Sequence, residues 1–257
     1  MIMKKIVKYV LLDILRNKIL ISYTLLLFAI TMTMLLLGDN ETKVLLSLLN
    51  IVLIVLPLVS IIFSTIYYYN SVEFIELLVC QPIRRTSILL SIYAGLTLSL
   101  LIAFAIGVGL PLLLMDHSST AALLVMIGCL LTVIFAALAI LGSVRMRDKT
   151  RGIGMAILAW FYFSLLYDGL VLFLLFQFSD YPLEKPSIVL GALNPIDLAR
   201  IMLLLRLDSS AMMGYTGAVF QEFFGSAGGT LLAFGLLLLW TMVPLLAAVR
   251  RFNHKDL

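Results

Sequence analysis

Charged residues are scarce in this chain. Asp, Glu, Lys and Arg together make up 12% of its 257 residues, against about 25% in soluble domains. Hydrophobic residues make up 63%, where roughly 45–50% is usual, and the mean hydropathy is +1.14. This composition excludes an ordinary water-soluble domain and indicates an integral membrane protein.

Cysteine is nearly absent, and several catalytic motifs are missing altogether. The two cysteines, Cys80 and Cys129, form neither a disulfide framework nor a metal-binding signature. The chain has no G-x-x-x-x-G-K-[ST] phosphate loop, no H-E-x-x-H and no G-x-S-x-G. We therefore assign no catalytic residue and no metal ligand, and we expect this chain to bind no cofactor itself.

Long apolar runs dominate what is present. A membrane-spanning helix needs about 20 apolar residues, and six runs qualify: 19–37, 46–68, 88–114, 121–141, 155–178 and 230–249. They predict an all-α integral membrane fold, one domain over residues 1–257. Within it we expect an interfacial helix (1–18), spans one to five (19–178), a helical outer segment (179–229), the sixth span (230–249) and a short tail (250–257).

The basic residues indicate the orientation of the six spans. If both termini share one side, that side holds fourteen of the eighteen Lys and Arg residues and the other side holds Lys43, Lys185, Arg200 and Arg206. The positive-inside rule then predicts that both termini are cytoplasmic, in a bacterial inner membrane. This distribution also explains the pI near 9.1 without a nucleic-acid partner.

The first 18 residues predict an amphipathic helix at the membrane surface. Apolar residues recur at helical spacing, while Lys4, Lys5 and Lys8 can reach lipid headgroups. The expected apolar stripe consists of Met3, Val7, Val10, Leu11 and Ile14, with Ile6 and Leu12 outside it. The alternative is a basic anchor with no further role.

The outer segment contains helix signals of its own. Asn194, Pro195 and Asp197 read as an N-cap, a proline at the first helical position and an acid in the first turn. They predict a helix through Arg206, and Asp208 or Ser209 could cap a second helix that ends near Gly225. Both are too short or too polar to span a membrane, so we expect them to dip back against the outer ends of the spans.

Between spans two and three the chain reads V-E-F-I-E-L-L-V-C-Q-P-I-R-R, residues 72–85. Glu73 and Glu76 share one helical face beside apolar residues, which favours a short cytoplasmic helix that docks in a groove of another protein. The predicted apolar anchors are Phe74, Ile75, Leu77 and Leu78. The alternative is a simple helix end at which Arg84 and Arg85 only maintain topology.

Asp168 lies near the middle of the fifth span. A carboxylate at that depth costs at least about 2.5–3.5 kcal/mol and is a functional candidate by default. A structural hydrogen bond is the alternative. The pairs Met32–Met34 and Met212–Met213 could suggest a soft metal, but packing explains them better, and His117 and His254 fall on opposite sides of the membrane.

The motif E-L-L-V-C-Q-P-I-R-R at residues 76–85, together with the six-span layout, resembles the ABC-2 type permeases. The resemblance implies a fold like that of type V ABC exporters. It also implies a dimer of this chain, a separate cytoplasmic ATPase dimer that binds ATP and Mg, and no catalysis by the permease. It further implies an ATPase-coupling role for Glu73, Phe74, Glu76, Leu77, Gln81, Arg84 and Arg85.

Within that family, L-N-P-I-D-L-A-R at residues 193–200 is similar to a segment of the nitrous-oxide-reductase maturation permeases. This similarity implies a periplasmic β-helical partner and assembly of a copper–sulfur centre. Asn194, Asp197 and Arg200 would then dock the periplasmic partner, or Asp197 and Arg200 would form a local pair. The alternatives are an ABC-2 exporter of a lipid, glycan or drug, a secondary transporter, and a membrane-embedded enzyme.

Overall fold

The computed structural model describes residues 2–38, 40–178, 184–206 and 227–254, and these residues form helices and short connections without strands. Six helical stretches are long and apolar enough to cross a membrane. Four of these stretches are single helices: α2 (Lys18–Leu37), α3 (Glu41–Asn70), α7 (Ser119–Arg145) and α13 (Ala227–Asn253). The predicted all-α fold with six spans is confirmed.

Two spans contain a π-helical turn. The third span joins α5 (Arg85–Phe104), η1 (Ala105–Gly109) and α6 (Leu110–Met115), and the fifth joins α8 (Lys149–Phe161), η2 (Tyr162–Leu166) and α9 (Tyr167–Gln177). A π-turn inserts one extra residue into the helical ladder and is often found at functional sites.

Polar side chains set the helix starts. The backbone N–H of Ile19 donates to Asn17 Oδ1 at 2.9 Å, and that of Thr42 donates to Asn40 Oδ1 at 3.0 Å. Ser118 and Asp148 cap α7 and α8 in the same way. Each cap satisfies a backbone N–H that has no partner within its own helix.

Helix α7 lies at the centre of the bundle, against α3, α5, α8 and α13. Its side chains Ile127, Leu131 and Ile134 are fully buried. Hydroxyl groups inside the bundle donate to the carbonyl four residues earlier, as Thr132 does to Gly128 at 2.9 Å. This pairing lets polar residues lie within apolar helices, where no water can satisfy them.

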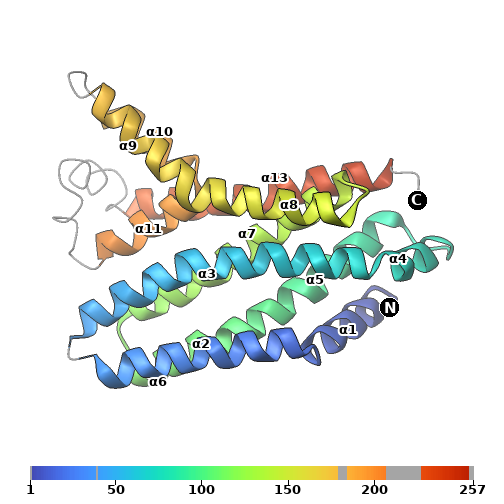
Figure 1. The fold of residues 1–257 in the computed structure, drawn as a ribbon, viewed down its shortest axis with the longest axis horizontal. Helices are drawn as coiled ribbons and strands as arrows, with labels where there is room; N and C mark the ends of the chain where they lie inside the picture. The colour runs from blue at the N-terminus through green and yellow to red at the C-terminus, as the bar shows by residue number, and fades with distance from the viewer. Residues whose placement is uncertain (1, 39, 179–183, 207–226, 255–257) are drawn as a thin grey trace.

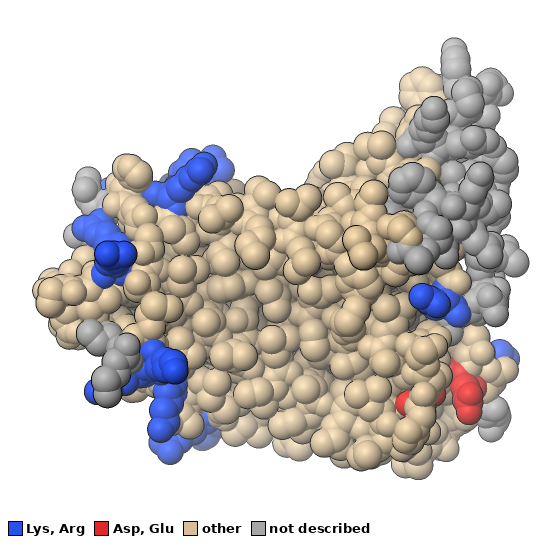
Figure 2. Space-filling model, turned by 180° about the vertical axis from the view of Figure 1, so that it is seen from behind, with Lys and Arg blue, Asp and Glu red and all other residues tan. Residues whose placement is uncertain are grey.

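Both termini and the short helix α4 (Val72–Val79) lie at one end of the bundle (Figure 1), which we call the terminal end. Lys and Arg gather at this end, and the middle of the visible face shows no charge (Figure 2). We call the opposite end the distal end. The shared placement of the termini agrees with the even number of spans and with the uneven charge distribution in the sequence.

The outer segment re-enters the bundle at the distal end. Helices α10 (Glu184–Ala192) and α11 (Pro195–Arg206) meet at a bend of 112°. Helix α11 packs against α3, α7 and α13, and its residues Ile196, Leu198 and Leu203 are buried. The predicted helix and its return to the bundle are confirmed. Helix α10 was not predicted, and the predicted helix 208–225 lies outside the described residues.

Helix α1 (Ile2–Leu15) packs against α5, and its buried stripe differs from the predicted one. Ile6, Val10 and Ile14 are buried, whereas Met3 is 45% exposed. The predicted stripe was wrong at Met3, which is exposed, and at Ile6, which is buried. Spacing alone fitted either stripe, and the packing of α1 against α5 buries the one that contains Ile6.

We expect Gly95→Ala to loosen this contact. A Cβ at Gly95 would lie 2.7 Å from Val10 Cγ1 and 3.1 Å from the Val7 carbonyl oxygen, and overpacking of this kind costs about 1–3 kcal/mol. Thermal unfolding of the purified protein measures the loss, and Val10→Ala in the same chain should restore part of it. Gly154→Ala is the matched control, because no atom lies within 4 Å of its added Cβ. Equal effects at the two glycines would contradict this packing.

Candidate functional site

The candidate surface at the terminal end is built on α4, which turns one face inward and one outward. Ile75 and Leu78 are 1% and 7% exposed, while Leu77 is 68% exposed and stands beside the exposed Glu73 and Glu76. The spacing of three and four residues accounts for both faces. Ile75 and Leu78 fill the core of this chain, so their predicted role as anchors for a partner is wrong.

Two further residues of the predicted coupling segment contact neighbouring helices. The ring of Phe74 lies 5.1 Å from that of Tyr9 in α1. Arg85 Nη1 donates to the carbonyl oxygen of Asn253, the last residue of α13, at 3.5 Å. A cation at a helix C-terminus is favourable because the last carbonyls carry partial negative charge. Phe74 and Arg85 therefore join α4 and α5 to the two terminal helices.

The remaining residues of the segment are exposed: Glu73, Glu76, Leu77, Gln81 and Arg84. We call this set the α4 surface. It offers two carboxylates, one apolar side chain, one amide and one guanidinium. A helical face of this kind suits a groove in another protein, where the apolar residue is buried and the charges determine orientation.

The second candidate site lies near the distal end, where the structure brings together four polar residues that we call the Arg200 cluster: Asp168, Asn194, Asp197 and Arg200. Arg200 Nη1 lies 2.6 Å from Asp168 Oδ2 and 3.4 Å from Asp197 Oδ1. Asp168 belongs to the fifth span and Arg200 to α11. The intramembrane carboxylate therefore forms an ion pair with the re-entrant helix.

Asn194 holds the start of α11 within this cluster. Its Oδ1 accepts a hydrogen bond from the backbone N–H of Ile196 at 3.0 Å, so the predicted N-cap is confirmed. Its Nδ2 donates to Asp197 Oδ2 at 3.0 Å and to the Phe163 carbonyl in η2 at 2.8 Å. The side chain is fully buried, so Asn194 holds the start of α11 from inside the fold and exposes no atom of its own. Arg200 and Asp197 form the alternative local pair.

The same region satisfies the last carbonyls of α10, which have no partner within their helix. Tyr167 donates its hydroxyl to the Leu190 carbonyl at 2.6 Å, and Trp240 in α13 donates Nε1 to the Ala192 carbonyl at 3.4 Å. Side chains of the fifth and sixth spans thus bind the backbone of the re-entrant pair.

Two carboxylates share one guanidinium in the Arg200 cluster. Burial, then a hydrogen bond with Asp168 and the Asp168 charge, raise the pKa of Asp197 well above its ordinary value, and Arg200 and Asn194 oppose this rise. The neutral form of Asp197 is therefore favoured while Asp168 is present. The link between Asp168 and Arg200 was missed in the sequence, although a lone carboxylate and a lone arginine in apolar surroundings could have suggested it.

One methionine of the pair in α2 has a packing role. Met34 packs against the hydrophobic core, and Met212 and Met213 lie outside the described residues. His117 follows α6 at the distal end and His254 follows α13 at the terminal end. Within the described ranges, no three His, Cys, Asp or Glu side chains gather as a metal site would require.

These features define a multi-pass membrane subunit with an exposed helix between its second and third spans and a re-entrant pair before its sixth. The sequence model of the family described as "ABC-2 family transporter protein" matches residues 51–257 of this chain. The match covers most of the chain, so the chain belongs to the ABC-2 transporter family. Such permeases are typically non-catalytic membrane subunits, and membership implies a partner ATPase. The predicted family resemblance is confirmed.

A known relative gives a finer comparison. The chain is 32% identical over 154 residues to the probable ABC transporter permease protein NosY of Pseudomonas aeruginosa. The aligned part covers 54% of this chain and 54% of that protein, so the match spans about half the length of each.

The two acids of the Arg200 cluster should be strongly interdependent. Asp168→Asn removes the closest partner of Arg200, but it also removes the Asp168 charge that helps to raise the pKa of Asp197, so Asp197 pairs with Arg200 more readily. We expect each single change to cost about 1 kcal/mol and the double variant Asp168→Asn/Asp197→Asn to cost about 3 kcal/mol, since the double leaves a largely buried cation unpaired.

Thermal unfolding of the four proteins in the double-mutant cycle measures this interaction. Asp148→Asn is the control, because the Asp148–Arg151 pair spans 3.8 Å at exposed side chains and should contribute less than about 1 kcal/mol. Costs that simply add, or a double variant as stable as the control, would argue against a shared role.

Proposed function

We propose that this chain couples ATP hydrolysis by a separate cytoplasmic ATPase to work at the distal side of the membrane, as the permease subunit of an ABC complex. The α4 surface carries the proposal, because it combines exposed carboxylates with an exposed Leu77 at the basic end of an ABC-2 family member. The positive-inside rule supports a cytoplasmic location for that end. The chain has no phosphate loop of its own, which agrees with ATP and Mg bound by the partner.

The connections of α4 support transmission of a movement. Ser71 alone separates α4 from α3, and residues 80–84 join α4 to α5. A partner that displaces α4 therefore acts directly on the ends of the second and third spans. Helix α3 has 30 residues and also contacts α11 at the distal end. In this proposal, α3 carries the displacement from the ATPase side to the re-entrant pair.

The proposed complex contains two copies of this chain. Residues Leu165, Leu172, Phe173 and Phe176 of the fifth span are exposed in the single chain. Faces of this kind contact lipid or a second copy of the chain, and the dimer expected of ABC-2 permeases would use part of this surface.

We further propose that the work at the distal side is assembly of the copper–sulfur centre of nitrous oxide reductase, with a periplasmic β-helical protein as partner. The similarity to the permease protein NosY supports this assignment, as does the N-P-x-D-x-x-R segment at residues 194–200. Asp197 and Arg200 retain partial exposure, at 14% and 29% of their side chains, and could form the edge of the docking surface. Export of a lipid, glycan or drug by the same ABC-2 machinery is the alternative.

Charge reversal on the α4 surface tests the coupling. We expect Glu73→Lys/Glu76→Lys to reduce ATP-dependent function by at least about tenfold, because misplaced charges at an interface cost several kcal/mol. The measurement compares ATP hydrolysis with the coupled function in the purified complex of permease and ATPase. Glu41→Lys is the matched control, an exposed acid in the first turn of α3 at the distal end. Unchanged coupling in the double variant would refute the proposed role of α4.

A deletion strain tests the finer assignment. Cells that lack this chain should produce nitrous oxide reductase protein without the absorption of its copper–sulfur centre, and the intact gene should restore it. A pull-down tests docking through Asp197 and Arg200. If the double variant Asp197→Ala/Arg200→Ala recovers the periplasmic partner as efficiently as the wild type does, docking through these residues is excluded. A reductase with its full copper–sulfur spectrum in the deletion strain would favour the exporter alternative.

A further inference from the structure

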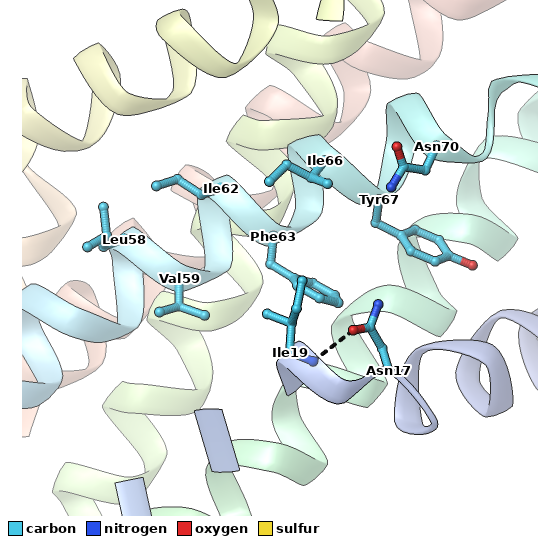
Figure 3. Close-up of a pocket in the computed structure, with 9 residues that line it drawn as sticks. All are labelled: Asn17, Ile19, Leu58, Val59, Ile62, Phe63, Ile66, Tyr67 and Asn70. Carbon is cyan, nitrogen blue, oxygen red and sulfur yellow. Dashed lines mark hydrogen bonds between the residues drawn. The ribbon is translucent and has the colours of Figure 1, made fainter. Parts of the chain in front are cut away.

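A cavity lies between the start of α2 and the terminal half of α3 (Figure 3). It has a volume of about 270 Å³, and one face of α3 supplies most of its wall through Val59, Ile62, Phe63 and Ile66. These residues follow the three- and four-residue spacing of a helix face. Helix α2 packs mainly against α5, η1 and α6, which leaves its first turn apart from α3.

The cavity is apolar along its length and polar at one end. Leu58 and Val59 line the part nearer the bundle centre, and Asn17 and Asn70 stand at the terminal end (Figure 3). Asn17 caps α2, and Asn70 is the last residue of α3. The cavity thus begins where two spans leave the apolar core and runs inward beside them. An occupant must be apolar along most of its length and polar at its outer end.

Basic residues lie near the polar end. Lys149 Nζ donates to Asn70 Oδ1 at 2.8 Å, and the exposed Arg16 and Lys18 flank Asn17 in the sequence. Two acids are also near. Asp13 accepts a hydrogen bond from the Tyr67 hydroxyl at 3.2 Å, and Asp148 faces Arg151 at 3.8 Å. Arg16, Lys18, Lys149 and Arg151 outnumber these acids, so the rim favours an anionic group.

We propose that this cavity binds one anionic phospholipid, with part of an acyl chain beside α3 and the phosphate at the rim near Lys18 and Lys149. The size of the cavity favours a chain over a helix of a second copy, because a helix with its side chains is about 10–12 Å across and each turn rises 5.4 Å. One turn already exceeds the available volume. The lipid would lie between the first turn of α2 and the last turns of α3, next to the point where α3 leads into α4.

A photoreactive lipid tests the site directly. The full-length protein is reconstituted in phosphatidylcholine vesicles that contain a small share of phosphatidylglycerol with a mid-chain diazirine. We expect the label to concentrate on residues 58–70 and on the first turn of α2. Val59→Trp fills the cavity and should lower this labelling several-fold. Leu25→Trp is the matched control, because Leu25 is 63% exposed on α2 and does not line the cavity.

The headgroup contact has a separate readout. The same diazirine on phosphatidylcholine should label the site less than the phosphatidylglycerol probe. Lys18→Gln and Lys149→Gln should each reduce this preference by about fivefold, the contribution of one cation near an anionic lipid, whereas Lys43→Gln at the distal end should not. Gln at position 149 keeps a donor for Asn70, and the unfolding temperature of each variant verifies its fold.

Two results would overturn the proposal. Label spread evenly over all exposed spans would show that the cavity holds no particular lipid. Equal labelling by both probes in the wild type would show that the rim does not select an anion. These outcomes are independent of the ATPase and of the periplasmic process, so the lipid site and the proposed function can fail separately.

Discussion

The pairing of Arg200 with Asp168 and Asp197 is the interaction on which the distal half of this molecule depends. No water is available at membrane depth, so a charge there must be satisfied by the protein. The guanidinium lies between a carboxylate of the fifth span and one of its own helix, and this fixes α11 against α9. The hydroxyl of Tyr167 and the indole of Trp240 then satisfy the end of α10. A segment too polar to cross the membrane is thereby held among helices that do.

The π-turn η2 helps to create this geometry. One residue inserted into a helix rotates every later side chain by about 100° relative to an unbroken α-helix. Asp168 comes two residues after η2, so the insertion determines the direction in which its carboxylate points. The same turn presents the Phe163 carbonyl to Asn194. The irregularity in the fifth span and the re-entry of the outer segment are therefore parts of one arrangement, and neither side chain could make its contact if η2 were regular helix.

Local patterns in the sequence were sufficient for the six spans, for α4 and for the cap of α11, because each depends on residues within a few turns. Contacts across the fold were not predictable in this way. Asp168 and Arg200 are 32 positions apart in the sequence, with a bend of 112° between them, and no local spacing indicates its direction. The choice between Met3 and Ile6 on α1, and the burial of Ile75, Leu78 and Asn194, likewise depend on which neighbouring helix comes close. Asp168 was recognised as a candidate from its depth alone, and its partner was not.

Helix α3 connects the features at the two ends. Its terminal half lines the cavity beside α2 and leads into α4, and its distal half shares a hydrophobic core with α7 and α11. Pro57 lies between these halves and has no N–H, so α3 lacks one helical hydrogen bond at its middle. A helix weakened there transmits a displacement less rigidly than an unbroken one, unless its neighbours hold it. Helix α7 supplies that support on one side, and on the side of α2 the terminal half of α3 borders the cavity. On the coupling route that we propose, an occupant of the cavity would therefore affect how firmly α3 links α4 to the helices around the Arg200 cluster.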